Sequence, residues 1–325
     1  MSDNNIGNKD GFINDFTNSL KKYLKDTYGE GITVNTHTAY KTNSEKIALT
    51  VEFGNNSKIC PTIYPEDFIE KYLQGMPMEN IVQAVGNNLY KNRMAGFERP
   101  VITAEEARKC IRLVVCNSAL NEQMLSQTPN YAICEGVLSA YPRWYVNDEA
   151  SFRVTTEIAG SIGLTGDEVL QIGLSNVRSE AYEAIPLGRM IENMTGVALT
   201  DEMEMDNGMQ MIVLTNENRL QGANQILNED ALRYVYDMCG SDICLLPSSI
   251  HEWICMPINE GMHPDMLRSM VAEINESTVA PEDRLGDFIL KYDGVKLTPV
   301  FGDTFDMEGI EEGLKVSGFK VKMTL

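Results

Sequence analysis

The sequence predicts an α+β protein of two domains, and three observations support this prediction. The first 97 residues have the pattern of one helix, three short alternating strands and two further helices. The last third reads as two strands joined by a helix, then a hairpin, a helix and a final strand. A chain of 325 residues with 43% hydrophobic side chains can also fill two cores. We therefore expect a small N-terminal helix plus antiparallel three-stranded meander over 1–97. Residues 98–325 should form a larger α+β domain with a mixed or antiparallel sheet that helices cover on one face.

The N-terminal domain begins with an amphipathic helix. Apolar residues recur at helical spacing from Phe12 onward, and Gly29 stands where a helix commonly stops. The three alternating runs that should form the meander are separated by turn-forming residues and cover 32–40, 47–53 and 59–64. Helical spacing returns over 66–73 and 78–89.

The second domain opens with Thr103 and Glu106, the spacing of a capping box, and Thr165 with Glu168 repeats it. The second box predicts a helix through 174, and another short helix is expected over 186–195. Strand patterns cover 111–116, 133–145, 211–214, 243–246, 252–256 and 288–292. Helices are expected over 229–239 and 264–275. The acidic, Met-rich stretch 200–208 reads as an exposed connection, and the order of the tail 300–325 is left open.

Composition argues against several classes of partner. The net charge of -20 disfavours direct binding to nucleic acid, because neutralising phosphates requires clustered Lys and Arg. No pair among the seven cysteines has the two-residue spacing of zinc knuckles or thioredoxin-like sites. We therefore expect reduced, mostly buried thiols. A polar N-terminus and the lack of a long apolar run predict no signal peptide and no membrane span. We expect a cytoplasmic protein.

The run from Leu245 to Glu252 is the main candidate for chemistry, because hydroxyls, an imidazole and a carboxylate interrupt an apolar stretch. In an extended segment Ser249 and His251 share a face, which would allow a nucleophile and base pair. Glu252 would lie on the opposite face, so Glu217 or Asp287 would have to orient the imidazole.

A structural interpretation of the same run is favoured. The chain lacks the Gly-x-Ser-x-Gly elbow that normally exposes a catalytic serine. Ser248, Ser249 and His251 would then satisfy backbone groups where two strands meet.

A polar loop after a predicted strand is the second candidate. Thr215, Asn216 and Glu217 follow that strand directly and should lie near Ser248, so a ligand site is expected there. The run His251 to Cys255 favours a strand rather than the helix of a zinc peptidase. The carboxylates between Asp201 and Asp206 do not fit a calcium loop. We predict no metal and no cofactor.

Several runs resemble the bacterial family called domain of unknown function 5688. The most specific is Leu246-Pro247-Ser248-Ser249-Ile250-His251-Glu252; others are Pro61-Thr62-Ile63-Tyr64, Asn117 with Asn121, Leu125 and Pro129, Val213-Leu214-Thr215-Asn216, Gly222-Ala223 and Glu273-Ile274-Asn275. They span about 10–293. The family has no assigned activity, so the resemblance implies a shared fold and a bacterial or mobile-element origin.

The expected function is binding of a protein partner or a small molecule without catalysis, since no spacing assembles a complete catalytic set. One alternative is a hydrolase-like enzyme that uses Ser249 and His251. A second is an acidic inhibitor or nucleic-acid mimic that acts on a host defence nuclease.

Overall fold

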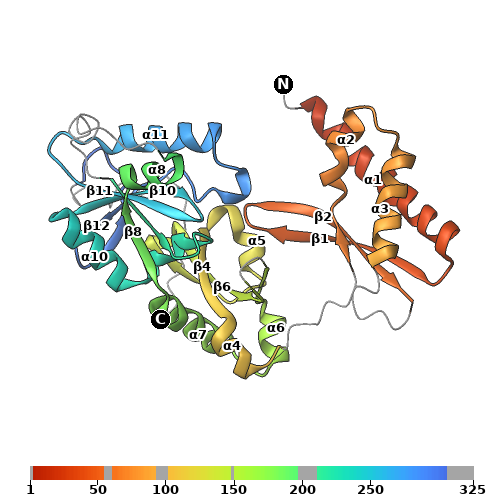
Figure 1. The fold of residues 1–325 in the computed structure, drawn as a ribbon, viewed down its shortest axis with the longest axis horizontal. Coiled ribbons are helices and arrows are strands. Elements are labelled where there is room, and N and C mark those ends of the chain that lie inside the picture. Colours follow the sequence, from red (N-terminus) through yellow and green to blue (C-terminus); the bar gives the residue numbers. More distant parts are fainter. Residues whose placement is uncertain (1–2, 55–60, 93–101, 148–149, 197–210, 306–325) are drawn as a thin grey trace. The chain divides into compact units, whose positions relative to one another are not determined.

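The computed structural model describes residues 3–54, 61–92, 102–147, 150–196 and 211–305 (Figure 1). The chain divides into two compact units, Met1–Pro100 and Val101–Leu325, called here the N-terminal and C-terminal units. The α+β class is confirmed, with an N-terminal helix and antiparallel meander followed by a larger α+β region.

The N-terminal unit contains the predicted meander, with strand order β1-β2-β3 and antiparallel pairing throughout. Its first helix begins earlier than the apolar pattern suggested and ends as predicted before Gly29. The elements are α1 (Asp3–Tyr28), β1 (Ile32–Lys41), β2 (Ser44–Phe53), β3 (Thr62–Ile63), η1 (Pro65–Phe68), α2 (Ile69–Leu73) and α3 (Met78–Asn92).

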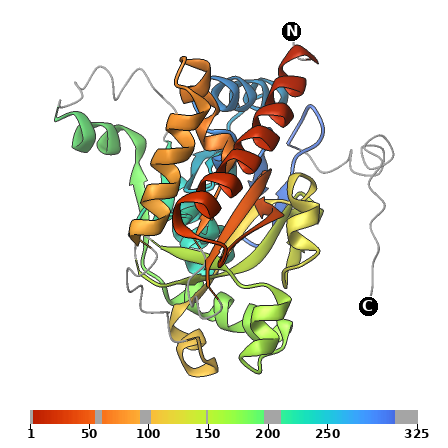
Figure 2. The same cartoon turned by 90° about the vertical axis from the view of Figure 1, so that its right-hand side faces the viewer.

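A single apolar core holds this unit together. Helices α1 and α3 lie side by side against one face of the meander (Figures 1 and 2). Phe16 and Leu20 on α1 are fully buried, and they share the core with Ile81 of α3 and Leu49 of β2. Gly86 of α3 lets the two helices approach closely, because a Cβ there would meet the Tyr23 ring at 2.6 Å.

The C-terminal unit contains two antiparallel sheets. One has the order β4-β6-β5, with β7 also pairing with β6, and the other has the order β13-β12-β10-β11-β9-β8. The strands of the first are β4 (Ile111–Asn117), β5 (Tyr131–Ile133), β6 (Leu138–Tyr145) and β7 (Ser151–Arg153). Those of the second are β8 (Tyr182–Pro186), β9 (Ile212–Asn216), β10 (Ile243–Ser249), β11 (Glu252–Pro257), β12 (Leu290–Tyr292) and β13 (Leu297–Pro299). The sequence did not predict β7, β8 or β13.

Two helices of this unit begin at the capping residues that the sequence indicates, Thr103 and Thr165. The Thr165 hydroxyl accepts from the Glu168 N–H at 3.2 Å, and the Glu168 carboxylate accepts from the Thr165 N–H at 2.8 Å, which completes a capping box. The helices are α4 (Ala104–Cys110), α5 (Glu122–Leu125), α6 (Thr156–Ser161), α7 (Gly166–Ser179), α8 (Leu187–Thr195), α10 (Glu229–Cys239) and α11 (Pro264–Ser277). Short 3-10 turns are η2 (Ala119–Asn121), η3 (Cys134–Gly136), η4 (Gly222–Leu227) and η5 (Pro281–Asp283).

The six-stranded sheet is covered on both faces, which corrects the expectation of one covered face. Along β10, Ile243 and Leu245 pack in the core that contains α10 and the first sheet. Cys244 and Leu246 point the other way, into a core with Leu267 of α11. Figure 1 shows α10 and α11 on opposite sides of the sheet. Because both faces are buried, these central strands read as continuous apolar runs.

Two of the predicted segments lie wholly or partly outside the residues that the structure describes. The acidic stretch 200–208, with its carboxylates, lies outside the described residues, as does the tail from 306 onward. Six cysteines are described as free thiols, four of them buried. No helix in the described ranges is both long and apolar enough to cross a bilayer.

Candidate functional site

The run that carries the hydroxyls and the imidazole forms a tight hairpin. Strand β10 ends at Ser249 and β11 begins at Glu252, with these two residues paired across the ladder. Ile250 and His251 therefore make the turn, and the backbone is not extended through His251 as the sequence suggested. The shared strand face expected for Ser249 and His251 does not exist.

Backbone groups and one carboxylate surround the His251 imidazole. Its Nδ1 accepts from the N–H of Gln221 at 3.1 Å, and its Nε2 lies 3.6 Å from Oδ1 of Asp283. The carbonyl of His251 accepts from the Thr215 hydroxyl at 2.7 Å. A neutral imidazole has a single acceptor nitrogen. Because Nδ1 already accepts a backbone N–H, this histidine has no lone pair left to deprotonate a nucleophile.

The hydroxyls of the hairpin are also engaged within it. Ser249 Oγ accepts from the N–H of His251 at 3.0 Å, and Ser248 Oγ donates to Oε1 of Glu252 at 3.1 Å. Within the described chain no hydrogen bond joins the Ser249 hydroxyl to the His251 imidazole. Of the two proposed orienting carboxylates, Glu217 is exposed, and Asp287 accepts from Asn275 at 2.7 Å. These bonds hold the hairpin turn to itself and to the segment 215–221.

The polar loop after β9 lies against this hairpin, as the predicted topology suggested. Thr215 and Asn216 are buried, whereas Glu217 points to solvent. Gly222 fills the gap between loop and turn, because a Cβ there would lie 2.2 Å from Thr215 Oγ1 and 2.6 Å from the carbonyl oxygen of His251. Only glycine fits between these two segments.

A network of buried side-chain amides anchors η4 to β4 and to Glu180, the residue that follows α7. Asn224 on η4 donates to the carbonyl of Leu113 on β4 at 2.9 Å. Gln225 donates to Glu180 at 3.2 Å, and Asn228 donates to Gln225 at 3.2 Å. All three amides are almost fully buried, so these bonds offset the cost of removing them from water. The sequence pattern at these positions is three amides in a short apolar segment, and it did not predict the network.

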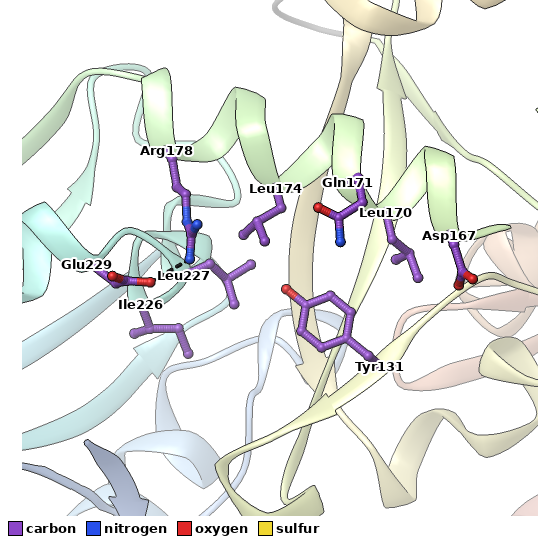
Figure 3. A pocket seen from close by; sticks show the side chains of 9 residues that line it. All are labelled: Tyr131, Asp167, Leu170, Gln171, Leu174, Arg178, Ile226, Leu227 and Glu229. Carbon is purple, nitrogen blue, oxygen red and sulfur yellow. Dashed lines mark hydrogen bonds and ion pairs between the residues drawn. The ribbon is translucent and has the colours of Figure 1, made fainter. Parts of the chain in front are cut away.

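The larger of two described pockets is a groove between α7, β5 and the segment that joins η4 to α10 (Figure 3). Its volume is about 690 Å³, within the range of roughly 300–1,000 Å³ typical of small-molecule sites. Leu170, Leu174, Ile226 and Leu227 form an apolar wall that is continuous with the core beneath. No pattern in the sequence indicated this groove, because its walls come from three distant segments.

Polar groups stand around the apolar wall. Figure 3 shows the Tyr131 side chain reaching across the groove toward α7, with its hydroxyl near Leu174 and Gln171. No partner for this hydroxyl occurs among the described residues. Burial raises the pKa of Tyr131, against the effect of the Arg178 charge, so the hydroxyl stays a donor at neutral pH. At one end Arg178 pairs with Glu229, and both side chains are at least half exposed.

The second pocket is smaller, about 150 Å³, and more polar. It contains one predicted site residue, Asn216, together with Arg112, Glu180 and Tyr145. Burial raises the pKa of the Glu180 carboxyl, while the neighbouring Arg112 charge opposes that shift. Burial also raises the pKa of Tyr145 to about 12. Neither described pocket is lined by Ser249 or His251.

Metal-ligating side chains do not cluster in the part of the chain that the structure describes. There, no three His, Cys, Asp or Glu side chains gather closely enough to hold a metal ion. No curated protein and no solved structure matches this chain. A family model does match, over residues 13–294, which is most of the sequence. As the Pro-Ser-Ser-Ile-His-Glu run predicted, the chain belongs to the family of unknown function DUF5688.

Proposed function

We propose that the C-terminal unit is a non-catalytic binding module whose ligand is a small amphipathic molecule held in the groove of Figure 3. The observation that supports this is the combination of an apolar wall with a donor hydroxyl and an ion pair at its rim. Ligand sites typically combine apolar walls with a few polar groups that fix orientation. A ring or short aliphatic group would pack on Leu170, Leu174 and Ile226.

The polar end of the ligand would be held by two groups. The Tyr131 hydroxyl would donate one hydrogen bond from the floor of the groove. The side chain of Arg178 is half exposed and that of Glu229 is 81% exposed, so their ion pair lies at the surface. A hydrogen-bond acceptor on the ligand can therefore bind the Arg178 guanidinium without displacing a buried ion pair. In this proposal the protein acts in the cytoplasm of a bacterium or of a host of its mobile element.

The test uses 8-anilinonaphthalene-1-sulfonate, an aromatic anion whose fluorescence rises when it binds apolar surface. We expect one saturable site in the folded protein. Leu174→Asp, which places a negative charge on the apolar wall, should weaken binding of this anion at least about tenfold, since a buried unpaired charge is costly and like charges repel. Tyr131→Phe removes a single hydrogen bond and should weaken binding by about fivefold.

The matched control is Ser175→Asp, which adds the same side chain at the next residue of α7. Ser175 is exposed and does not line the groove. This control variant should bind the probe as tightly as the unmodified protein does. Equal binding by Leu174→Asp and Ser175→Asp would show that the groove is not the site. A covalent serine probe that labels Ser249, and fails to label His251→Ala, would support the hydrolase alternative instead.

A further inference from the structure

The smaller pocket of the C-terminal unit has the chemistry of a second, independent ligand site. It lies where the end of α4, the start of β4, the end of β6 and the loop after β9 meet. Its charged side chains are Lys109, Arg112 and Glu180. Lys109 forms an ion pair with Glu106 at 3.3 Å, so Arg112 is the cation of this wall that can recognise a ligand.

The guanidinium of Arg112 is held in place from two sides. Its Nε lies 3.3 Å from Oε1 of Glu180, and its central carbon lies 5.3 Å from the centre of the Tyr145 ring. The side chain is 32% exposed, and no acceptor for its two terminal amino groups occurs among the described residues. A guanidinium whose Nε is engaged still presents parallel N–H groups that match a carboxylate in a fork.

Glu180 does not compete for those amino groups. Its Oε2 accepts from the side-chain amide of Gln225 at 3.2 Å, and its Oε1 lies 3.3 Å from the Arg112 Nε. Each carboxylate oxygen therefore already has a donor. Glu180 acts as a support that orients Arg112 through Nε, and the two terminal amino groups of Arg112 remain to bind a ligand.

The pocket is too small for most metabolites. Its volume of about 150 Å³ equals that of roughly five water molecules at about 30 Å³ each. A carboxylate with a stem of one or two carbons has about that size. The Tyr145 hydroxyl supplies a further donor, and Leu220 contributes apolar surface for the stem.

We propose that this pocket binds a small aliphatic monocarboxylate, with Arg112 as the fork that receives the carboxylate. The site is separate from the groove of Figure 3, because the two share no lining residue. Its occupancy can therefore be tested whether or not the groove binds a ligand.

The test exploits two partly exposed thiols in the same chain. Cys110 lines the pocket, whereas Cys239 on α10 does not. The full-length protein is labelled with N-ethylmaleimide, with and without propionate, and mass spectrometry follows both cysteines. At ten times its dissociation constant, propionate should slow labelling of Cys110 about tenfold, because only the free protein exposes the thiol. Labelling of Cys239 should not change.

Three controls test the chemistry of recognition. Propionamide has the shape of propionate without its charge, and it should not protect Cys110. Arg112→Lys keeps the positive charge beside Glu180 but loses the fork, so it should bind propionate about tenfold more weakly. Asn218→Phe leaves Arg112 intact and fills the pocket from an exposed lining position, so it should abolish protection.

Three outcomes would overturn the proposal. One is equal protection of Cys110 and Cys239, which would reveal a general salt effect. Another is protection by propionamide as strong as that by propionate, which would show that the charge is not recognised. The third is unchanged propionate binding in both Arg112→Lys and Asn218→Phe, which would place the ligand elsewhere.

Discussion

Replacing Gly222 by alanine should destabilise the C-terminal unit strongly. The added Cβ would lie 2.2 Å from Thr215 Oγ1, 2.6 Å from the His251 carbonyl oxygen and 2.7 Å from the Asn216 nitrogen. Two of these three atoms belong to the backbone, so a side-chain rotation cannot relieve the contact. The loop after β9 and the hairpin turn would have to separate.

The size of the effect follows from two contributions. Overpacking of a filled site typically costs about 1–3 kcal/mol. Separation of the segments also breaks the hydrogen bond from Thr215 to the His251 carbonyl, which contributes about 1 kcal/mol. We expect a loss of about 3 kcal/mol in the free energy of unfolding. With a urea dependence of about 2 kcal/mol per molar, the midpoint should fall by about 1.5 M.

Tryptophan fluorescence during a urea titration reports the unfolding of the C-terminal unit, where the loss is expected. The chain has two tryptophans, Trp144 and Trp253, and both are buried in the C-terminal unit. Gly160→Ala on α6 is the matched control, because no atom lies within 4 Å of its added Cβ. Alanine favours a helix over glycine by up to about 1 kcal/mol, so this control should be neutral or slightly stabilising. A Gly222→Ala midpoint within about 0.3 M of the unmodified protein would refute the steric reasoning.

Three further predictions concern α7 and the thiols. Thr165→Ala should lower the free energy of unfolding by about 1 kcal/mol, measured by the same urea titration, because the capping box is lost. Hydrogen bonds from Thr165 lower the pKa of Glu168, so the stability that this carboxylate contributes is present above the ordinary carboxyl pKa and is lost as pH falls through the lowered value. When urea midpoints are plotted against pH, Glu168→Gln should therefore lose less stability in acid than the unmodified protein does. An equal loss in the two proteins would contradict this. Burial raises the pKa of four thiols, to about 12 for Cys116, Cys134 and Cys244 and well above the ordinary value for Cys255. A thiol reagent at pH 8 should therefore modify these four cysteines only after urea unfolds the protein.

Elements with local signals could be predicted from the sequence, and elements set by distant contacts could not. Helix α10 matched its predicted bounds because Asn228 caps its start and Gly240, with φ of 68°, ends it. The short strands β8 and β13 carry no distinctive pattern of their own. Each lies at an edge of the six-stranded sheet, and its pairing depends on a neighbour elsewhere in the chain.

The candidate sites show the same division. The sequence identified Ser248 to Glu252 as polar groups in an apolar run, and it identified the loop at Asn216. It did not reveal that His251 forms a turn, since the bonds that hold it come from Gln221 and Thr215. The groove was missed because a leucine pair four residues apart on α7 has the same pattern whether it faces a core or a ligand.

The amide network around η4 has an evolutionary consequence. An apolar contact tolerates a slightly smaller or larger partner, but a buried amide without its partner costs about 1–3 kcal/mol. Gln225 bonds Glu180 and receives a bond from Asn228, so a substitution at Glu180 or Asn228 removes a partner of Gln225, and a substitution at Gln225 removes a partner of both. Relatives of this chain should therefore vary at these three positions together rather than one at a time.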